Sequence, residues 1–223
     1  MNDRTATASA ATEPCADCPR CPRLADYRLR NRHAEPDWHN APVASFGAAD
    51  ARLLIVGLAP GVRGANRTGR PFTGDYAGDL LYATLLETGF ASGHYRADPA
   101  DGLTLVDARI TNAVRCVPPQ NKPTPAEIAT CRDYLAATIR AMPRLSAILV
   151  LGRIAHESTL AARGLRRAAF PFAHGARHEL PDARPGGLRL HCSYHCSRYN
   201  TQTRRLTPAM FMAVVQRLRD ELG

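Results

Sequence analysis

Long apolar stretches and a secretory leader are both missing from this chain of 223 residues. Apolar runs such as Leu53–Val56 are far short of the roughly 18 residues that a membrane span needs. The first dozen residues contain no apolar core of the kind that a signal peptide carries. With 45% hydrophobic residues, the chain is also too apolar to be disordered throughout. These features predict a soluble, cytoplasmic protein with no membrane segment.

Lysine is almost absent as well, since only Lys122 stands among the 29 basic residues and the rest are arginine. Against 20 acidic residues this gives a formal net charge of +9. Arginine carries a planar set of N–H donors that suits bidentate contacts with phosphate, so the composition favours an anionic polymer as partner. A compositional bias toward alanine and arginine would give the same charge without nucleic acid. The charge alone leaves both interpretations open.

Seven cysteines are too many for chance in a cytoplasmic chain, and an odd number does not suit a disulfide framework. Cys15, Cys18 and Cys21 form a C-x-x-C-x-x-C run, whereas Cys116 and Cys131 stand alone further along the chain. A C-x-x-C pair with two distant thiols suffices to hold zinc or an iron–sulfur cluster, and the spacing does not choose between them. For Cys116 and Cys131 alone, packing as buried cysteines is the simpler interpretation.

Apolar runs alternate with helical patterns along the chain. We expect strands at residues 51–56, 110–114, 147–151 and 188–192, a short edge element at 103–107, and helices at 21–32, 79–89, 125–142, 153–162 and 208–222. Because each strand is apolar throughout, the pattern predicts an α/β fold with three layers, α/β/α, around a mostly parallel sheet of about four strands. Residues 1–14 are expected to be disordered, and residues 15–223 to form one domain.

Polar, turn-rich segments follow three of the expected strands. They are GLAPG at 57–61, TNAVRC at 111–116 and HCSYHCSRYNTQT at 191–203. Because the carboxyl ends of parallel strands meet at one edge of a sheet, these segments should form a single cleft. We expect the chemistry of the protein there.

Together these loops resemble those of the uracil-DNA glycosylase superfamily, most closely its family 5. The resemblance runs from about Cys18 to Thr207 and depends on GLAPG (57–61), NRTGRPFTGD (66–75), CVPPQNKPTP (116–125) after Asn112, and SYHCSRYNTQTRRLTP (193–208). It implies a DNA repair enzyme that flips uracil out of DNA and excises it hydrolytically, leaving an abasic site. Deaminated purines such as hypoxanthine are further candidate substrates. The motif loops hold no lysine except Lys122, so a Schiff-base lyase step is not expected.

The resemblance also implies roles for individual residues. Asp75 is the catalytic carboxylate, and His195 donates a hydrogen bond to the departing base. From the sequence alone, capping the helix that follows is the simpler interpretation of Asp75, and the two roles are compatible. Residues implied to contact the substrate are Gly57, Leu58, Ala59, Pro60, Gly61, Phe72, Asn112, Ser197, Arg198 and Asn200. Arginines expected to contact phosphate are Arg67, Arg70, Arg204 and Arg205.

A four-iron, four-sulfur cluster is implied by the same resemblance. Its ligands would be Cys18, Cys21, Cys116 and Cys131, with Cys15 at the same spacing as a competing ligand. The implied partner is double-stranded DNA that contains uracil, bound by a monomer associated with the nucleoid. Two other interpretations remain: a non-catalytic iron–sulfur DNA-binding or redox module on the same fold, and a zinc-stabilised nucleic-acid-binding domain.

Overall fold

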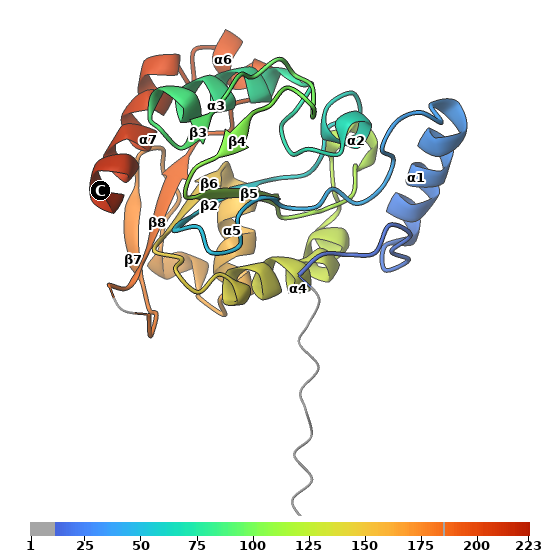
Figure 1. The fold of residues 1–223 in the computed structure, drawn as a ribbon. Coiled ribbons are helices and arrows are strands. Elements are labelled where there is room, and N and C mark those ends of the chain that lie inside the picture. The colour runs from blue at the N-terminus through green and yellow to red at the C-terminus, as the bar shows by residue number, and fades with distance from the viewer. Residues whose placement is uncertain (1–11, 185) are drawn as a thin grey trace, which may run out of the picture.

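A six-stranded sheet runs through the centre of the computed structural model, which describes residues 12–184 and 186–223 (Figure 1). Its strand order is β1-β5-β2-β6-β8-β7. The four inner strands are parallel to one another, and the two edge strands are antiparallel to their neighbours. The strands are β1 (Phe46–Gly47), β2 (Leu53–Gly57), β5 (Ala108–Asn112), β6 (Ala147–Leu151), β7 (Arg177–Leu180) and β8 (Leu188–Ser193).

Helices cover both faces of this sheet. In the view of Figure 1, α3 (Tyr76–Glu87) and α7 (Pro208–Leu222) lie above it, and α4 (Pro125–Ala141) and α5 (Arg153–Ala162) lie below it. Helix α1 (Pro22–Ala34) lies beyond one end of the sheet (Figure 1). The remaining elements are short: α2 (Ala65–Thr68), α6 (Arg198–Gln202), two 3-10 helices (Pro119–Asn121 and Arg167–Ala169) and a two-stranded sheet of β3 (Ala91–Ser92) and β4 (Thr104–Leu105). The three-layer α/β fold predicted from the sequence is confirmed.

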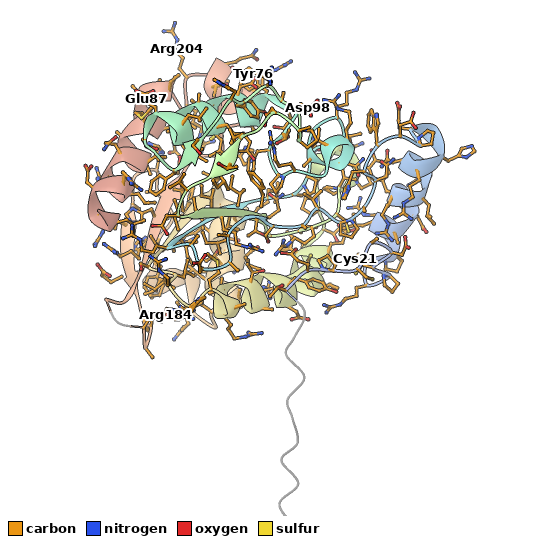
Figure 2. The ribbon with its side chains drawn as sticks, in the orientation of Figure 1. Cys21, Tyr76, Glu87, Asp98, Arg184 and Arg204 are labelled. Atoms are coloured by element: carbon orange, nitrogen blue, oxygen red, sulfur yellow. The ribbon has the colours of Figure 1, made fainter. Side chains whose placement is uncertain are left out.

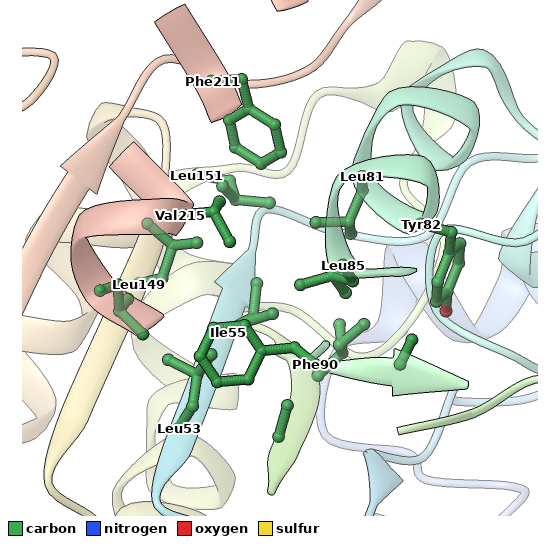
Figure 3. Packing of buried hydrophobic residues seen from close by; sticks show 14 of the residues in the cluster. Leu53, Ile55, Leu81, Tyr82, Leu85, Phe90, Leu149, Leu151, Phe211 and Val215 are labelled. Atoms are coloured by element: carbon green, nitrogen blue, oxygen red, sulfur yellow. The ribbon is translucent and has the colours of Figure 1, made fainter. Parts of the chain in front are cut away.

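Successive residues of the inner strands pack into two different cores. Leu53 and Ile55 of β2, with Leu149 of β6, contact the cluster beneath α3 and α7, where Leu81, Leu85, Phe211 and Val215 meet them (Figure 3). Their neighbours Leu54, Val56, Ile148 and Val150 belong to the second cluster, on the side of α4 and α5. A strand whose two faces are both buried must be apolar at every position, which explains the unbroken apolar runs.

The four expected strands form the parallel centre of the sheet, but the two edge strands were not predicted. β1 has only two residues, too few to give an alternating pattern. β7 reads Arg-His-Glu-Leu, and only its last residue, Leu180, is buried. Edge strands pair on one side and face solvent, so neither needed the apolar run by which the inner strands were found.

Several boundaries differ from the sequence-based expectation, among them that of β5, which ends at Asn112 and not at residue 114. Helix α3 begins at Tyr76, three residues earlier than expected, because Asp75 caps it. The expected disordered segment lies mostly outside the described residues, but its last part is held in place, since a carboxylate oxygen of Glu13 accepts a hydrogen bond from Arg115 at 2.8 Å. Among the described residues, no helix combines the length and the apolar character that crossing a membrane requires.

Candidate active site and cysteine cluster

The carboxyl ends of β2, β5 and β8 lie at one edge of the sheet, as their parallel registers require. There, with the loop before α3, they enclose a cavity of about 30 Å³. Its walls are formed by Ala59, Pro60, Gly61, Ala65, Phe72, Asp75, Ala77, Asn112 and His195. The structure therefore brings together the two predicted catalytic residues, most of the GLAPG segment and two predicted base-contacting residues.

Asp75 occupies the floor of this cavity and also caps α3. Its Oδ1 accepts a hydrogen bond from the backbone N–H of Gly78 at 3.2 Å, so the predicted capping role is confirmed. Gly64 lies against the carboxylate so closely that a Cβ there would come within 2.4 Å of Oδ2. Burial raises the pKa of Asp75. The carboxylate is thus held in one position and kept poorly solvated.

Asn112 ends β5 with its side chain pointing into the same cavity. It is 3% exposed, and its Oδ1 accepts no hydrogen bond from any residue that the structure describes. Gly57, its partner across the strand pair, has no room for a side chain, since a Cβ there would lie 2.3 Å from Oδ1. A buried amide oxygen without a donor is costly, so this position is suited to a ligand that brings an N–H group.

Phe72 lies beside Asn112 and is fixed by an unusual backbone. Its φ is +56°, in the left-handed region that residues other than glycine rarely adopt. The Tyr95 hydroxyl donates to the carbonyl oxygen of Phe72 at 3.2 Å, and the Tyr82 hydroxyl donates to that of Pro71 at 2.6 Å. The ring, 6% exposed, stands 5.9 Å from the ring of His195. Strain of this kind is retained where the surroundings require one position of a side chain.

His195 enters the cavity from the loop after β8. Burial lowers its pKa to about 4, so the imidazole is neutral at physiological pH and offers one N–H donor. The side-chain amide of Asn200 donates to the carbonyl oxygen of His195 at 2.9 Å. Asn200 was predicted to contact the substrate, and in this structure its amide holds the histidine loop.

Basic and aromatic side chains surround the mouth of the cavity. Ser197 caps α6, and Arg198 on that helix is exposed and stacks over the ring of Tyr76 at 5.2 Å. Arg67, Arg204 and Arg205 are exposed, as a phosphate-contacting role requires. Tyr76 and Arg204 lie at the same end of the molecule in Figure 2, the end where α3 and α6 meet.

Arg70 was predicted to contact phosphate, and the structure contradicts this. Its guanidinium is 5% exposed and forms a bidentate ion pair with Asp101, both contacts being 2.8 Å. It also donates to Thr73 Oγ1 at 2.7 Å. Arg70 therefore fixes the loop that carries Phe72 and Asp75 from inside. Sequence position placed this arginine correctly in the loop but could not show the direction of its side chain.

A wider hollow of about 480 Å³ adjoins the cavity and shares His195 with it. Leu58 lines this hollow rather than the cavity itself. Its other walls are Leu151, Gly152, Arg153, Ile154, Ala155, Phe172, Ala173, Tyr194, Asn200 and Arg205. Arg153 and Phe172 were missed from the sequence. Arg153 comes directly after Gly152, the glycine that follows strand β6, and this position indicates nearness to the site. Phe172 lies in an irregular segment whose sequence gives no such indication.

Four cysteines line a second, separate cavity near α1 and α4: Cys18, Cys21, Cys116 and Cys131. Cys15 is exposed and does not line it. In Figure 2, Cys21 lies well away from Tyr76 and Arg204, so this cavity is not part of the catalytic one. The structure thus groups the four thiols that were predicted as ligands.

The polar surroundings of these thiols fit a group that carries negative charge. Arg28 is 4% exposed, and its Nη1 lies 3.8 Å from Cys116 Sγ while its Nε has no partner among the described residues. The backbone N–H of Arg115 donates to Cys131 Sγ at 3.3 Å. Burial raises the pKa of Cys116 to about 12, so this thiol would ionise only with a metal bound.

The spacing of the thiols bears on which metal group suits them. In the described part of the chain, one group of three His, Cys, Asp or Glu residues has ligand atoms that all lie within 4.8 Å of one another. That group lies outside the four-cysteine cavity. The four thiols are not such a group. Around a single zinc ion, with bonds of about 2.3 Å, sulfur ligands lie closer together than around a multinuclear cluster.

Comparison with known proteins agrees with this geometry. The family model for the uracil DNA glycosylase superfamily matches residues 44–219. The chain belongs to this superfamily. It is 47% identical over 204 residues to a type-5 uracil-DNA glycosylase of Thermus thermophilus, covering 89% of this chain and 90% of that protein. Identity to proteins of the same name is 44% in Mycobacterium leprae, covering 86% of each chain, and 37% in Pyrobaculum aerophilum, covering 93% of this chain and 90% of that protein.

The Arg70–Asp101 ion pair, which holds the loop that carries Phe72 and Asp75, leads to a prediction. Asp101→Asn leaves the buried Arg70 guanidinium without its counter-charge, so we expect the free energy of unfolding to fall by about 3–5 kcal/mol. Arg70 holds the pKa of Asp101 well below its usual range. The stabilisation is therefore complete above the unfolded pKa of about 3.9 and is lost as the pH falls through the folded value.

Denaturant unfolding of wild type and Asp101→Asn across the acid range measures both effects. The matched control is Asp133→Asn, which removes an exposed carboxylate paired with Arg20. The wild type should lose stability more steeply with falling pH than Asp101→Asn, whereas Asp133→Asn should follow the wild type. Equal losses in the two variants would contradict a structural role for the buried pair.

Proposed function

We propose that this protein is a monofunctional uracil-DNA glycosylase, which hydrolyses the bond between deoxyribose and uracil and leaves an abasic site. The observation that carries the proposal is the convergence of Asp75, Asn112 and His195 on one cavity. Family membership and the names of the relatives support it. A pure DNA-binding or redox module would need neither the buried carboxylate nor the neutral histidine.

Each group in the cavity meets one requirement of the reaction. Positive charge develops on the sugar as the bond to the base breaks, and the Asp75 carboxylate is suited to stabilise it and to orient the attacking water. Negative charge develops on the base, and the neutral imidazole of His195 donates an N–H to a base oxygen. Water adds its oxygen to C1′ and supplies the proton that the departing uracil takes up.

Recognition of the base follows from the other two side chains. The Oδ1 of Asn112, which has no donor among the described residues, would accept the N3–H of uracil, and the amide nitrogen would donate to an adjacent carbonyl. Phe72 stacks on the flipped base. Leu58 brings no carboxylate or amide to the GLAPG segment, so water activation depends on Asp75, and the less polar surroundings favour further substrates such as hypoxanthine.

The partner we propose is double-stranded DNA containing uracil, bound by a monomer that works at the nucleoid. Arg198 and Tyr199 on α6 are exposed beside the mouth of the cavity, where they would fill the space of the extruded base. Arg67, Arg204 and Arg205 would contact phosphates on either side. The net charge of +9 supports such an electrostatic interface.

We also propose that Cys18, Cys21, Cys116 and Cys131 hold a four-iron, four-sulfur cluster. Such a group would supply a structural link between the segment before α1 and the start of α4, away from the reacting atoms. Arg28 and the backbone N–H of Arg115 would donate to its sulfur ligands. The exposure of Cys15 argues against it as a ligand.

Excision of uracil from a duplex oligonucleotide tests the function directly. Asp75→Asn retains the helix cap but removes the charge, so we expect kcat/KM to fall about 10²- to 10⁴-fold while the fold is kept. Asp79→Asn, four residues along the same helix and exposed, is the matched control and should retain activity.

Strong activity in Asp75→Asn would shift the catalytic role to His195 and the backbone. If the folded wild type, brown from its cluster, excised neither uracil nor hypoxanthine, the enzyme proposal would fail. The non-catalytic iron–sulfur DNA-binding module would then be the better interpretation.

The pH dependence of excision follows from the two protonation states. The reaction needs ionised Asp75, whose pKa is raised, so kcat/KM should fall on the acid side as that carboxyl takes up a proton. His195, with its pKa near 4, is already neutral above pH 5 and should add no limb between about pH 5 and pH 8. A pH–rate profile measures this, and a limb near pH 6.5 that disappears in His195→Asn would contradict it.

The cluster is tested by comparing two cysteine variants. Cys18→Ser removes a proposed ligand, so protein purified without oxygen should lose its brown colour and most of its iron, about four per chain. Cys15→Ser removes an exposed thiol three residues away and should retain both. The opposite result would assign the ligand to Cys15, and one zinc per chain in a colourless wild type would exclude the cluster.

A further inference from the structure

Three metal-ligating side chains meet on the face of the sheet that α5 covers, outside both sites described above. His156 comes from α5, His178 from β7 and Cys192 from β8, and their ligand atoms all lie within 4.8 Å of one another. His178 pairs across the strands with Leu190, two residues before Cys192, so His178 and Cys192 share one face of the sheet. Helix α5 brings His156 onto that face.

His156 has no hydrogen-bond partner for either ring nitrogen among the described residues, although it is only 2% exposed. Its neighbours include the ring of Phe172, 5.4 Å away, and the ring of His178 at 6.5 Å. An imidazole buried with two unsatisfied nitrogens is costly. The position therefore suits a histidine whose ring nitrogen lone pair binds a ligand that is not part of the protein.

His178 is oriented in the way that metal ligands commonly are. Its Nε2 lies 3.0 Å from the carbonyl oxygen of Pro171. Only a protonated Nε2 can donate to a carbonyl, which leaves the lone pair on Nδ1. A backbone carbonyl that accepts from one ring nitrogen while the other binds metal is a frequent arrangement around histidine ligands.

We propose that His156, His178 and Cys192 form a binding site for one divalent ion of the zinc class. Two imidazole nitrogens and one thiolate are ligands that Zn²⁺ prefers, and three protein ligands leave a fourth tetrahedral position for water. On binding, the Cys192 sulfur gives its proton to solvent and bonds to the ion. The ion would link α5 to the edge strand β7 and to β8.

This site is distinct from the four-cysteine cavity. Cys192 packs in the core cluster beneath α4 and α5, whereas Cys116 and Cys131 belong to a different cluster with Leu24. Its ligand atoms are also close enough for a single ion. The simplest competing explanation is that His156 serves only as an aromatic packing residue against Phe172.

Cobalt titration of the full chain with its native metal content distinguishes these explanations. Co²⁺ bound tetrahedrally through a thiolate gives intense visible bands and a sulfur-to-cobalt charge-transfer band, read as a difference spectrum. We expect one equivalent to bind. His156→Phe keeps the aromatic contact but removes the ligand, and Cys192→Ser removes the sulfur. Both should abolish the charge-transfer band, whereas Cys15→Ser, which removes an exposed thiol elsewhere, should retain it.

Zinc binding should also appear in thermal stability. At a zinc concentration about a hundredfold above Kd, the melting temperature of the wild type should rise by about 5–10 °C, and that of His156→Phe should not change. Absence of the cobalt bands in the wild type would overturn the proposal. Bands in His156→Phe and Cys192→Ser that are as strong as those of the wild type would also overturn it. His156 would then be a packing residue only.

Discussion

Burial of both faces of four parallel strands is the constraint on which the rest of this structure depends. Because Ile55 and Val56 of β2 face different cores, helices must cover each side, and each strand must be joined to the next by a connection that crosses the sheet. Those connections leave from one edge. The turns after Gly57, Asn112 and Ser193 therefore meet there, although they are far apart in the sequence. The active-site cavity is a consequence of how the core is buried.

Within that cavity, desolvation sets the properties of the side chains. It raises the pKa of Asp75, lowers that of His195, and leaves the amide oxygen of Asn112 without a donor from the part of the chain that the structure describes. All three effects would be small in water. The surrounding structure maintains these effects. Gly64 and Gly57 stand where any side chain would displace Asp75 or Asn112, and the Arg70–Asp101 ion pair holds the loop that carries Phe72 and Asp75.

Much of the site could be predicted from the sequence because its residues sit at strand ends or helix starts. Asp75 precedes an expected helix and Asn112 lies in the middle of a sheet strand that was expected at residues 110–114, so both were placed near the site without coordinates. Arg70 lies in the motif at 66–75 and Asn200 in the motif at 193–208. Arg70 is buried in an ion pair, whereas the Asn200 amide donates to the carbonyl oxygen of His195. Motif membership places a residue near a site but does not fix the direction of its side chain.

The sequence by itself determined the layer order, the four inner strands and the four thiols, since apolar runs and cysteine spacing are local features. Tertiary structure alone decided that β1 and β7 form the two edges of the sheet and that Cys15 is exposed to solvent. It also decided that His156, His178 and Cys192 meet. The physical reason is that exposure, pairing at an edge and contact between distant elements depend on how the whole chain packs, which no local pattern of residues records.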